Sequence, residues 1–165
     1  MTAFHSVLGS PLLLRKVSGN KRKESEIVKI QRVDTWAASM EDKFGALAAK
    51  LKALAEAGVN LEFVIARRAP DKPGTGVVFV TPIKGAKQSG AAGDAGFQKT
   101  ASLHTVRVEG RDKPGQGARM AQALADKGLN LRGMSAVAIA NKFVCHIAVD
   151  TEAAAARVAR TLRAL

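Results

Sequence analysis

Alternating apolar and polar positions mark the strands in the second half of the chain. Residues 103–110 alternate in this way, which is typical of a strand with one buried face. Residues 143–150 alternate too, with an apolar side chain at every second position from Phe143. A short connection at 141–142 joins this strand to an apolar stretch at 130–140, so the two are predicted to form a hairpin.

A different spacing separates these strands and predicts helices. Residues 115–127 carry Met120, Leu124 and small alanines at helical intervals. Gly128 follows where the end of a helix favours a positive φ angle. Thr151 is placed to cap a closing helix. The predicted order is strand, helix, strand, strand, helix.

The same order is repeated earlier in the chain. Five pairs of identical residues recur at a constant offset of 70 positions: Asp42 and Asp112, Gly45 and Gly115, Leu54 and Leu124, Gly58 and Gly128, Asn60 and Asn130. A fixed offset shared by glycines and an asparagine indicates an internal duplication, not a bias toward alanine.

The first copy is predicted from the same pattern, with a less regular second half. We expect strands near residues 34–40, 60–69, 76–83 and 98–102, and helices at 46–57 and within 84–97. A second Asp-Lys-Pro-Gly sequence, at 71–74, lies between two predicted strands and is interpreted as a hairpin turn.

We therefore predict an α+β fold with two ferredoxin-like βαββαβ modules in tandem, each an antiparallel sheet with its helices on one face. The predicted boundaries are a poorly ordered basic leader at 1–32, a first module at 33–102 and a second at 103–165. No fourth strand is evident after the last helix. Either the second sheet is one strand short, or a partner chain or the first module covers its edge.

Charge and composition narrow the function. The net charge is +12, and the leader accounts for +5 of it, with seven Lys or Arg and two acids. We interpret its basic run at 21–23 as a solvated tail, which can also bind nucleic acid or anionic lipid non-specifically.

The single cysteine excludes an internal disulfide and indicates a reducing compartment. No apolar stretch approaches the roughly 20 residues that span a membrane. We expect a cytoplasmic protein with no membrane partner.

The motifs of the second copy resemble the ACT domain, the family named after aspartate kinase, chorismate mutase and prephenate dehydrogenase. A strand is followed by Asp-Lys-Pro-Gly at 112–115, an Ala- and Leu-rich helix, and Gly-Leu-Asn-Leu at 128–131. With both copies, the resemblance covers about residues 33–165. It implies a regulatory, allosteric protein whose modules pair, giving a homodimer. It also implies that a small effector, usually an amino acid, binds where modules meet near the strand–helix glycine loops, and that a regulated enzyme is the partner.

The resemblance also implies which residues bind the ligand. In the second module they are Asp112, Lys113, Pro114, Gly115, Gly117, Asn130 and Leu131, and in the first Asp42, Lys43, Gly45, Asn60 and Leu61. A glycine lets the backbone approach a ligand, and the free N–H groups of a first helical turn suit a carboxylate. Asp112 can receive an ammonium group or simply cap the helix. In the first module Phe44 replaces the proline, so that loop is shaped differently.

The sequence also bears on catalysis and on nucleic-acid binding. Catalysis, a metal site and a cofactor are not expected, because the chain offers three scattered His, one strand Cys, no Tyr and no paired carboxylates. Nucleic-acid binding is the alternative, since RNA-recognition motifs share the βαββαβ fold but need exposed aromatic residues. We expect Phe63 and Phe79 in the core and the arginines at 157, 160 and 163 on a solvated helix face.

Overall fold

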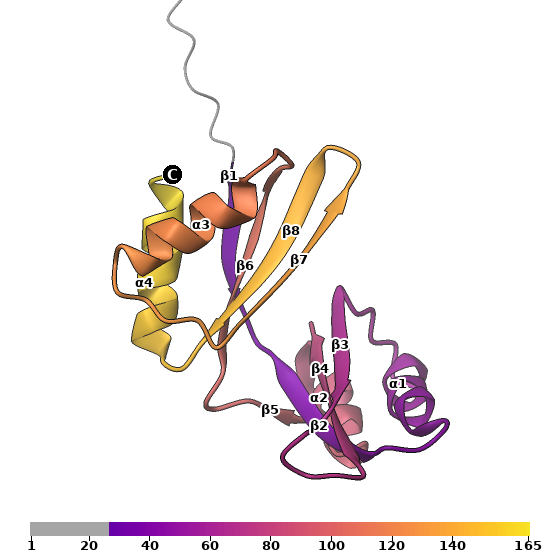
Figure 1. Ribbon diagram of the computed structural model, residues 1–165. Coiled ribbons are helices and arrows are strands. Elements are labelled where there is room, and N and C mark those ends of the chain that lie inside the picture. The colour runs from indigo at the N-terminus through magenta and orange to yellow at the C-terminus, as the bar shows by residue number, and fades with distance from the viewer. Residues whose placement is uncertain (1–26) are drawn as a thin grey trace, which may run out of the picture.

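The computed structural model describes residues 27–165, which form two four-stranded antiparallel sheets with four helices (Figure 1). Each sheet carries two helices on one face. The predicted fold class is therefore confirmed. The basic run at residues 21–23 lies outside the described residues.

The first module has the complete predicted βαββαβ order. Its elements are β2 (Trp36–Glu41), α1 (Ala46–Glu56), β3 (Phe63–Arg68), β4 (Thr75–Thr81), α2 (Gly85–Asp94) and β5 (Gln98–Lys99). The strands lie in the order β3-β4-β2-β5. Residues 71–74 connect β3 to β4, as expected of a hairpin turn.

The second module contains β6 (His104–Arg111), α3 (Gln116–Ala125), β7 (Gly133–Ile139), β8 (Lys142–Val149) and α4 (Glu152–Arg163). Its fourth strand comes from the other end of the described chain. Strand β1 (Ile27–Val33) pairs antiparallel with β6, with Ile30 opposite Val108, so the strand order is β1-β6-β8-β7.

Strand β1 corrects the sequence analysis. The prediction that the leader contributes little to the fold is wrong for residues 27–32, which cover the edge that the sequence left open. Ile27 is buried and Ile30 packs against the core of the second module. A register shift between Ile27 and Lys29 interrupts the alternation that would have marked the strand.

Each module encloses its own hydrophobic core between sheet and helices. Leu54 and Leu124, a pair from the repeat, are both 1% exposed and occupy corresponding places in the two cores. Cys145 is fully buried in the second core, and burial raises the pKa of its thiol to about 11, consistent with a structural role. The interiors repeat because the apolar positions repeat.

Several local predictions are confirmed. Gly128 has a φ of 63°, and the Thr151 hydroxyl accepts a hydrogen bond from the backbone N–H of Ala154 at 3.1 Å. The turn between β7 and β8 consists of Ala140 and Asn141, one position earlier than expected, and Ala140 has a φ of 55°. The arginines at 157, 160 and 163 are exposed on α4.

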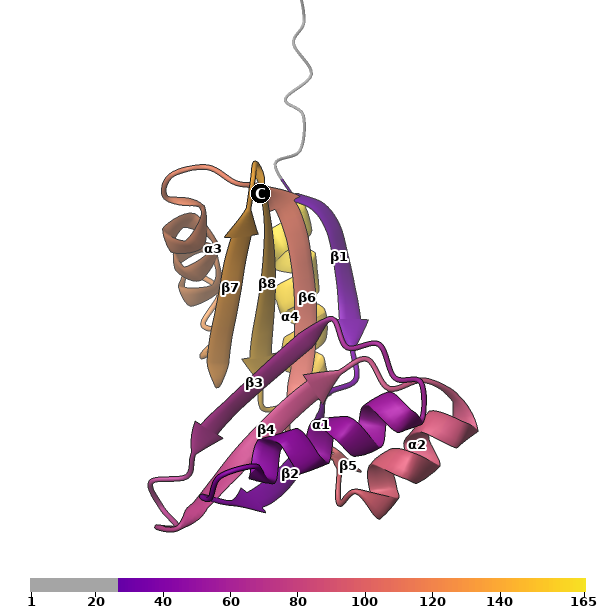
Figure 2. The same ribbon diagram turned by 90° about the vertical axis from the view of Figure 1, so that its right-hand side faces the viewer.

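The two modules meet through the uncovered faces of their sheets. Figure 2 shows β3 crossing the second module near the ends of β6 and β8. The ring of Phe63 stacks on His146 of β8 with centroids 4.3 Å apart, and Glu62 lies 3.6 Å from Arg107 of β6. Among residues 27–165, no helix is long and apolar enough to cross a membrane, and no cluster of His, Cys, Asp or Glu could hold a metal.

Candidate ligand-binding sites

The glycine loop of the second module lies between β6 and α3, at the end of the sheet away from the first module (Figure 1). Gly115 takes a φ of 80° and occupies the N-cap position of α3 without a side-chain cap. A positive φ here favours glycine. In the first turn, the backbone N–H of Gln116 donates to the Lys113 carbonyl at 3.1 Å, while those of Gly117 and Ala118 have no backbone acceptor among the described residues. A hollow of about 290 Å³ opens beside the loop, and it is lined by Asp112, Lys113, Gly115, Gln116, Gly117, Met120, residues 136–138 and Phe143.

Asp112 does not cap the helix. Its backbone N–H donates to the carbonyl of Asn141 at 2.9 Å, which holds the loop against the β7–β8 turn. Within residues 27–165, the Asp112 carboxylate has no ion pair or hydrogen bond. The structure thus leaves a carboxylate at the rim of the hollow, as an ammonium-binding role requires.

Gln116 is a residue that the sequence analysis missed. It begins α3, lines the hollow and is only 6% exposed, yet its Nε2 has no acceptor among the described residues. A buried donor without a partner costs about 1–3 kcal/mol, so such a group marks a place where a ligand can supply the acceptor. Its signal in the sequence is a polar residue directly after the glycine loop, where the repeat partner is Ala46.

The first module has the corresponding hollow, about 240 Å³ in volume, but with different chemistry. Arg68 already pairs with Asp42, with Nε and Oδ2 2.8 Å apart. Ala46 provides no amide group, and the Phe44 side chain is fully exposed. Lys43 and Gly45 remain at the loop, where Lys43 forms an ion pair with Glu41.

The remaining predicted site residues lie elsewhere. Asn130 and Leu131 come between α3 and β7, at the opposite end of the helix from Gly115, roughly 15 Å away along ten residues. Asn60 and Leu61 hold the equivalent place in the first module. Both asparagines are exposed and both leucines are partly buried against the cores. The structure therefore separates them from the glycine loops. Pro114 is exposed in its loop and does not line the hollow.

A larger cavity lies between the two modules, and the sequence analysis did not predict it. Its volume is about 330 Å³. It is lined by Thr35, Phe63, Ile65, Arg67, Phe79, Thr100, Ser102, Leu103, Thr105, Arg132, Gly133, Met134, Ser135, His146 and Ala148. None of the predicted site residues is among them. The expectation that Phe63 and Phe79 belong to a core is wrong, because both line this cavity on the uncovered face of their sheet.

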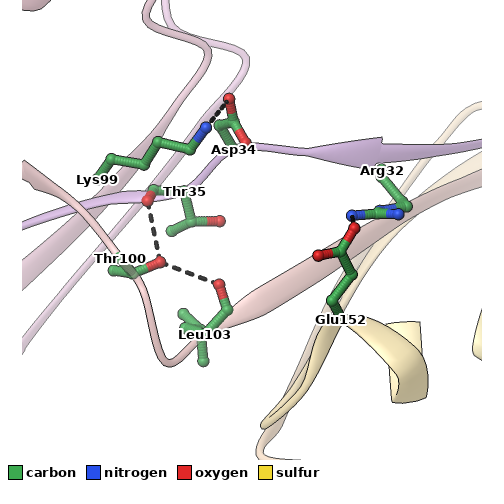
Figure 3. Close-up of polar contacts among 7 residues, drawn as sticks. All are labelled: Arg32, Asp34, Thr35, Lys99, Thr100, Leu103 and Glu152. Carbon is green, nitrogen blue, oxygen red and sulfur yellow. Dashed lines mark hydrogen bonds and ion pairs between the residues drawn. The ribbon is translucent and has the colours of Figure 1, made fainter. Parts of the chain in front are cut away.

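Two linkers contribute to the lining of the cavity, residues 34–35 between β1 and β2 and residues 100–103 between β5 and β6. They contact each other (Figure 3). The Thr100 hydroxyl lies 3.1 Å from the carbonyl oxygen of Thr35 and 3.0 Å from that of Leu103, while Lys99 pairs with Asp34 at 2.7 Å. The hydroxyls of Thr35 and Thr105, residues 70 positions apart, share a buried hydrogen bond of 2.8 Å. The two linkers are thus hydrogen-bonded to each other, and Thr35 of the first linker is also hydrogen-bonded to β6.

His146 lines the inner part of the cavity. It is 7% exposed, and its Nε2 has no hydrogen-bond partner in the described part of the chain. Burial, and then the positive charge of Arg107, lower the pKa of His146 to about 4. The ring is therefore neutral at pH 7.

Comparison with solved structures identifies the fold. A protein from Bacteroides thetaiotaomicron is similar with a TM-score of 0.68 and 18% identity, over 81% of this chain and 90% of that one. The ligand-free regulatory subunit of aspartate kinase from Thermus thermophilus is similar with a TM-score of 0.58 and 18% identity, over 84% of this chain and 97% of that one. The regulatory subunit of aspartate kinase from Thermus flavus is similar with a TM-score of 0.52 and 18% identity, over 84% of this chain and 99% of that one. No sequence profile of a known family and no curated protein sequence matches the chain.

Proposed function

We propose that this chain, which has the tandem ACT-domain fold, is a cytoplasmic regulatory protein without catalytic activity that binds an amino acid at the glycine loop of its second module. One observation carries the proposal. Among residues 27–165, the buried side-chain amide of Gln116 has no acceptor, and it lines the same hollow as the Asp112 carboxylate, which has no ion pair within those residues, and the uncapped first turn of α3.

The chemistry of the hollow matches both ends of an amino acid. The first-turn N–H groups of α3 that follow Gln116 and the side-chain amide of Gln116 donate to the α-carboxylate, which the positive end of the helix dipole also favours. Asp112 receives the ammonium group. The side chain of the ligand then lies against Met120, Phe143 and the small residues at 136–138.

The second module is favoured over the first for two reasons. Arg68 occupies the Asp42 carboxylate, which would have to give up an ion pair before it could bind an ammonium group. Ala46 also removes the amide that Gln116 supplies. The first module therefore keeps a hollow at its glycine loop, but its carboxylate is already paired and the amide group is missing.

The same hollow suggests how binding regulates a partner. It lies beside β7, an edge strand whose Val137 and Ile139 are 55% and 71% exposed. Exposed apolar edges favour pairing, so a second copy of the chain pairing along β7 would cover the ligand. An amino acid held there stabilises one paired arrangement, and a regulated enzyme responds to it.

The test is thermal unfolding of the full chain across the common amino acids at millimolar concentration. At 100 times its Kd, a ligand raises the free energy of unfolding by roughly 2.7 kcal/mol, a shift of several degrees. Asp112→Asn and Gln116→Leu should abolish the shift, and Asp42→Asn, the matched control, should keep it. Loss of the shift in Asp42→Asn alone would assign binding to the first module. No shift with any amino acid would refute the function.

The nucleic-acid alternative has less support. The uncovered face of the second sheet, where an RNA platform would lie, is partly occupied by the first module through the Phe63–His146 stack. Salt-sensitive retention of the chain on RNA, lost when Phe63 is changed to Ala, would favour this alternative.

A further inference from the structure

The cavity between the modules shares no lining residue with the glycine-loop hollow of the second module, and its walls come from both halves of the chain. Strands β3 and β4 of the first module form one wall and β7 and β8 of the second form the other. At about 330 Å³ it has room for a small molecule. A molecule bound there contacts both modules at once.

Positive charge is the first chemical feature of this cavity. Its lining includes two basic residues, Arg67 and Arg132. Within the described part of the chain, the side chain of Arg67 has no ion pair or hydrogen bond, while its backbone pairs with β4. Arg132 donates from Nη1 to the Ser102 carbonyl at 2.6 Å and lies 3.5 Å from Asp150, which leaves its other donors available.

The second feature is a missing negative charge. Among the described residues that line the cavity there is no Asp or Glu, whereas the glycine-loop hollow has Asp112. The two arginines can therefore bind an anion. An ammonium group that entered the cavity would lose its hydration and find no carboxylate among the lining residues to replace it. The two sites differ in the charge they select.

The third feature is an apolar wall with hydroxyls at one end. Phe63, Ile65, Phe79 and Met134 line the cavity across from one another on the two sheets. His146 adds a neutral ring whose Nε2 has no partner in residues 27–165. Such a wall accommodates an aliphatic body, and the unpartnered nitrogen is a group that a ligand can satisfy.

We infer that this cavity binds a small aliphatic carboxylate that lacks an ammonium group, held by Arg67 and Arg132, and that its occupancy fixes the relative position of the two modules. This site is additional to the amino-acid site and independent of it. Because the ligand contacts both walls, it favours the arrangement in which the walls face each other.

Three matched probes test the inference on the full chain. 4-Methylpentanoate presents a carboxylate and an isobutyl group, leucine adds an ammonium group, and 4-methylpentanamide removes the charge. The readout is the NMR signal of the His146 ring, assigned with His146→Phe, which reports this cavity and not the glycine loop. We expect 4-methylpentanoate to shift the signal saturably, with leucine and the amide at least about tenfold weaker.

Two variants complete the test. Arg67→Gln combined with Arg132→Gln should weaken 4-methylpentanoate at least about tenfold. Arg160→Gln, the same change on the exposed face of α4, should leave its binding unchanged. The inference is overturned if no probe shifts His146, if leucine or the amide binds as well as the acid, or if the double variant binds normally. Leucine that perturbs only the signals of residues 115–117, while 4-methylpentanoate shifts His146, supports both the amino-acid site and the exclusion of an ammonium group from this cavity.

Discussion

The buried histidine at the junction predicts how stability depends on pH. His146 has a lowered pKa of about 4, against 6.5 for the free side chain, because burial and then Arg107 disfavour its charged form. Glu62 and Glu109 act in the opposite direction, but both carboxylates face Arg107. As the pH falls, His146 therefore takes up a proton near pH 6.5 in the unfolded chain but only near pH 4 in the folded chain.

The difference between the two pKa values sets the direction and the size of the change in unfolding free energy with pH. A group whose pKa is lower in the folded state contributes stability that is complete above the unfolded pKa and is lost as the pH falls toward the folded pKa. With the two values above, the loss relative to pH 7 is about 2 kcal/mol at pH 5 and about 3 kcal/mol at pH 4.

The assay is urea unfolding of the protein and of His146→Phe at pH 7, 5 and 4. Phenylalanine keeps the stacking on Phe63 and removes the proton-binding group, so the variant should lack this loss. Hydrogen bonds from Lys43 and Arg32 lower the pKa values of the Glu41 and Glu152 carboxyl groups, respectively. These two groups titrate equally in both proteins and cancel in the comparison. Equal losses of unfolding free energy in the two proteins would refute the burial argument.

Three further predictions concern the scaffold. Leu124→Ala should lower the free energy of unfolding by about 2–5 kcal/mol in urea titrations, since Leu124 is 1% exposed, and Leu54→Ala should do the same in the first module. Ala140→Gly should raise the thermal midpoint, gaining up to about 1 kcal/mol, because Ala140 holds a φ of 55° that alanine disfavours. Thr35→Val should cost about 1–3 kcal/mol by leaving the buried Thr105 hydroxyl unpaired, and adding Thr105→Val should restore most of that loss in a double-mutant cycle.

The module architecture could be predicted because the two periodicities mark the strands and helices, and because the offset of 70 relates the first strand, first helix and second strand of the two copies. Strand β1 could not, because its pairing with β6 joins residues about 80 positions apart and its alternation breaks between Ile27 and Lys29. Local patterns specify which face of a strand is apolar but not which distant strand lies beside it.

The candidate sites were only partly predictable. Asp112 and Gly115 were found because the loop between strand and helix carries them as a motif. Phe63 and Phe79 were assigned to the wrong face because β4 is apolar on both sides, as Val78 and Val80 fill the core while Phe79 faces the cavity. Where both faces of a strand are apolar, periodicity does not identify the core side.

The most direct test of the central claim is a titration of the common amino acids followed by the NMR signals of the Gly115, Gln116 and Gly117 backbone amides and the Gln116 side-chain amide. We predict that one amino acid shifts all four signals saturably while the Gly45 amide of the first module does not move. If no amino acid shifts these signals, or if the Gly45 amide responds and they do not, the second glycine loop is not the effector site.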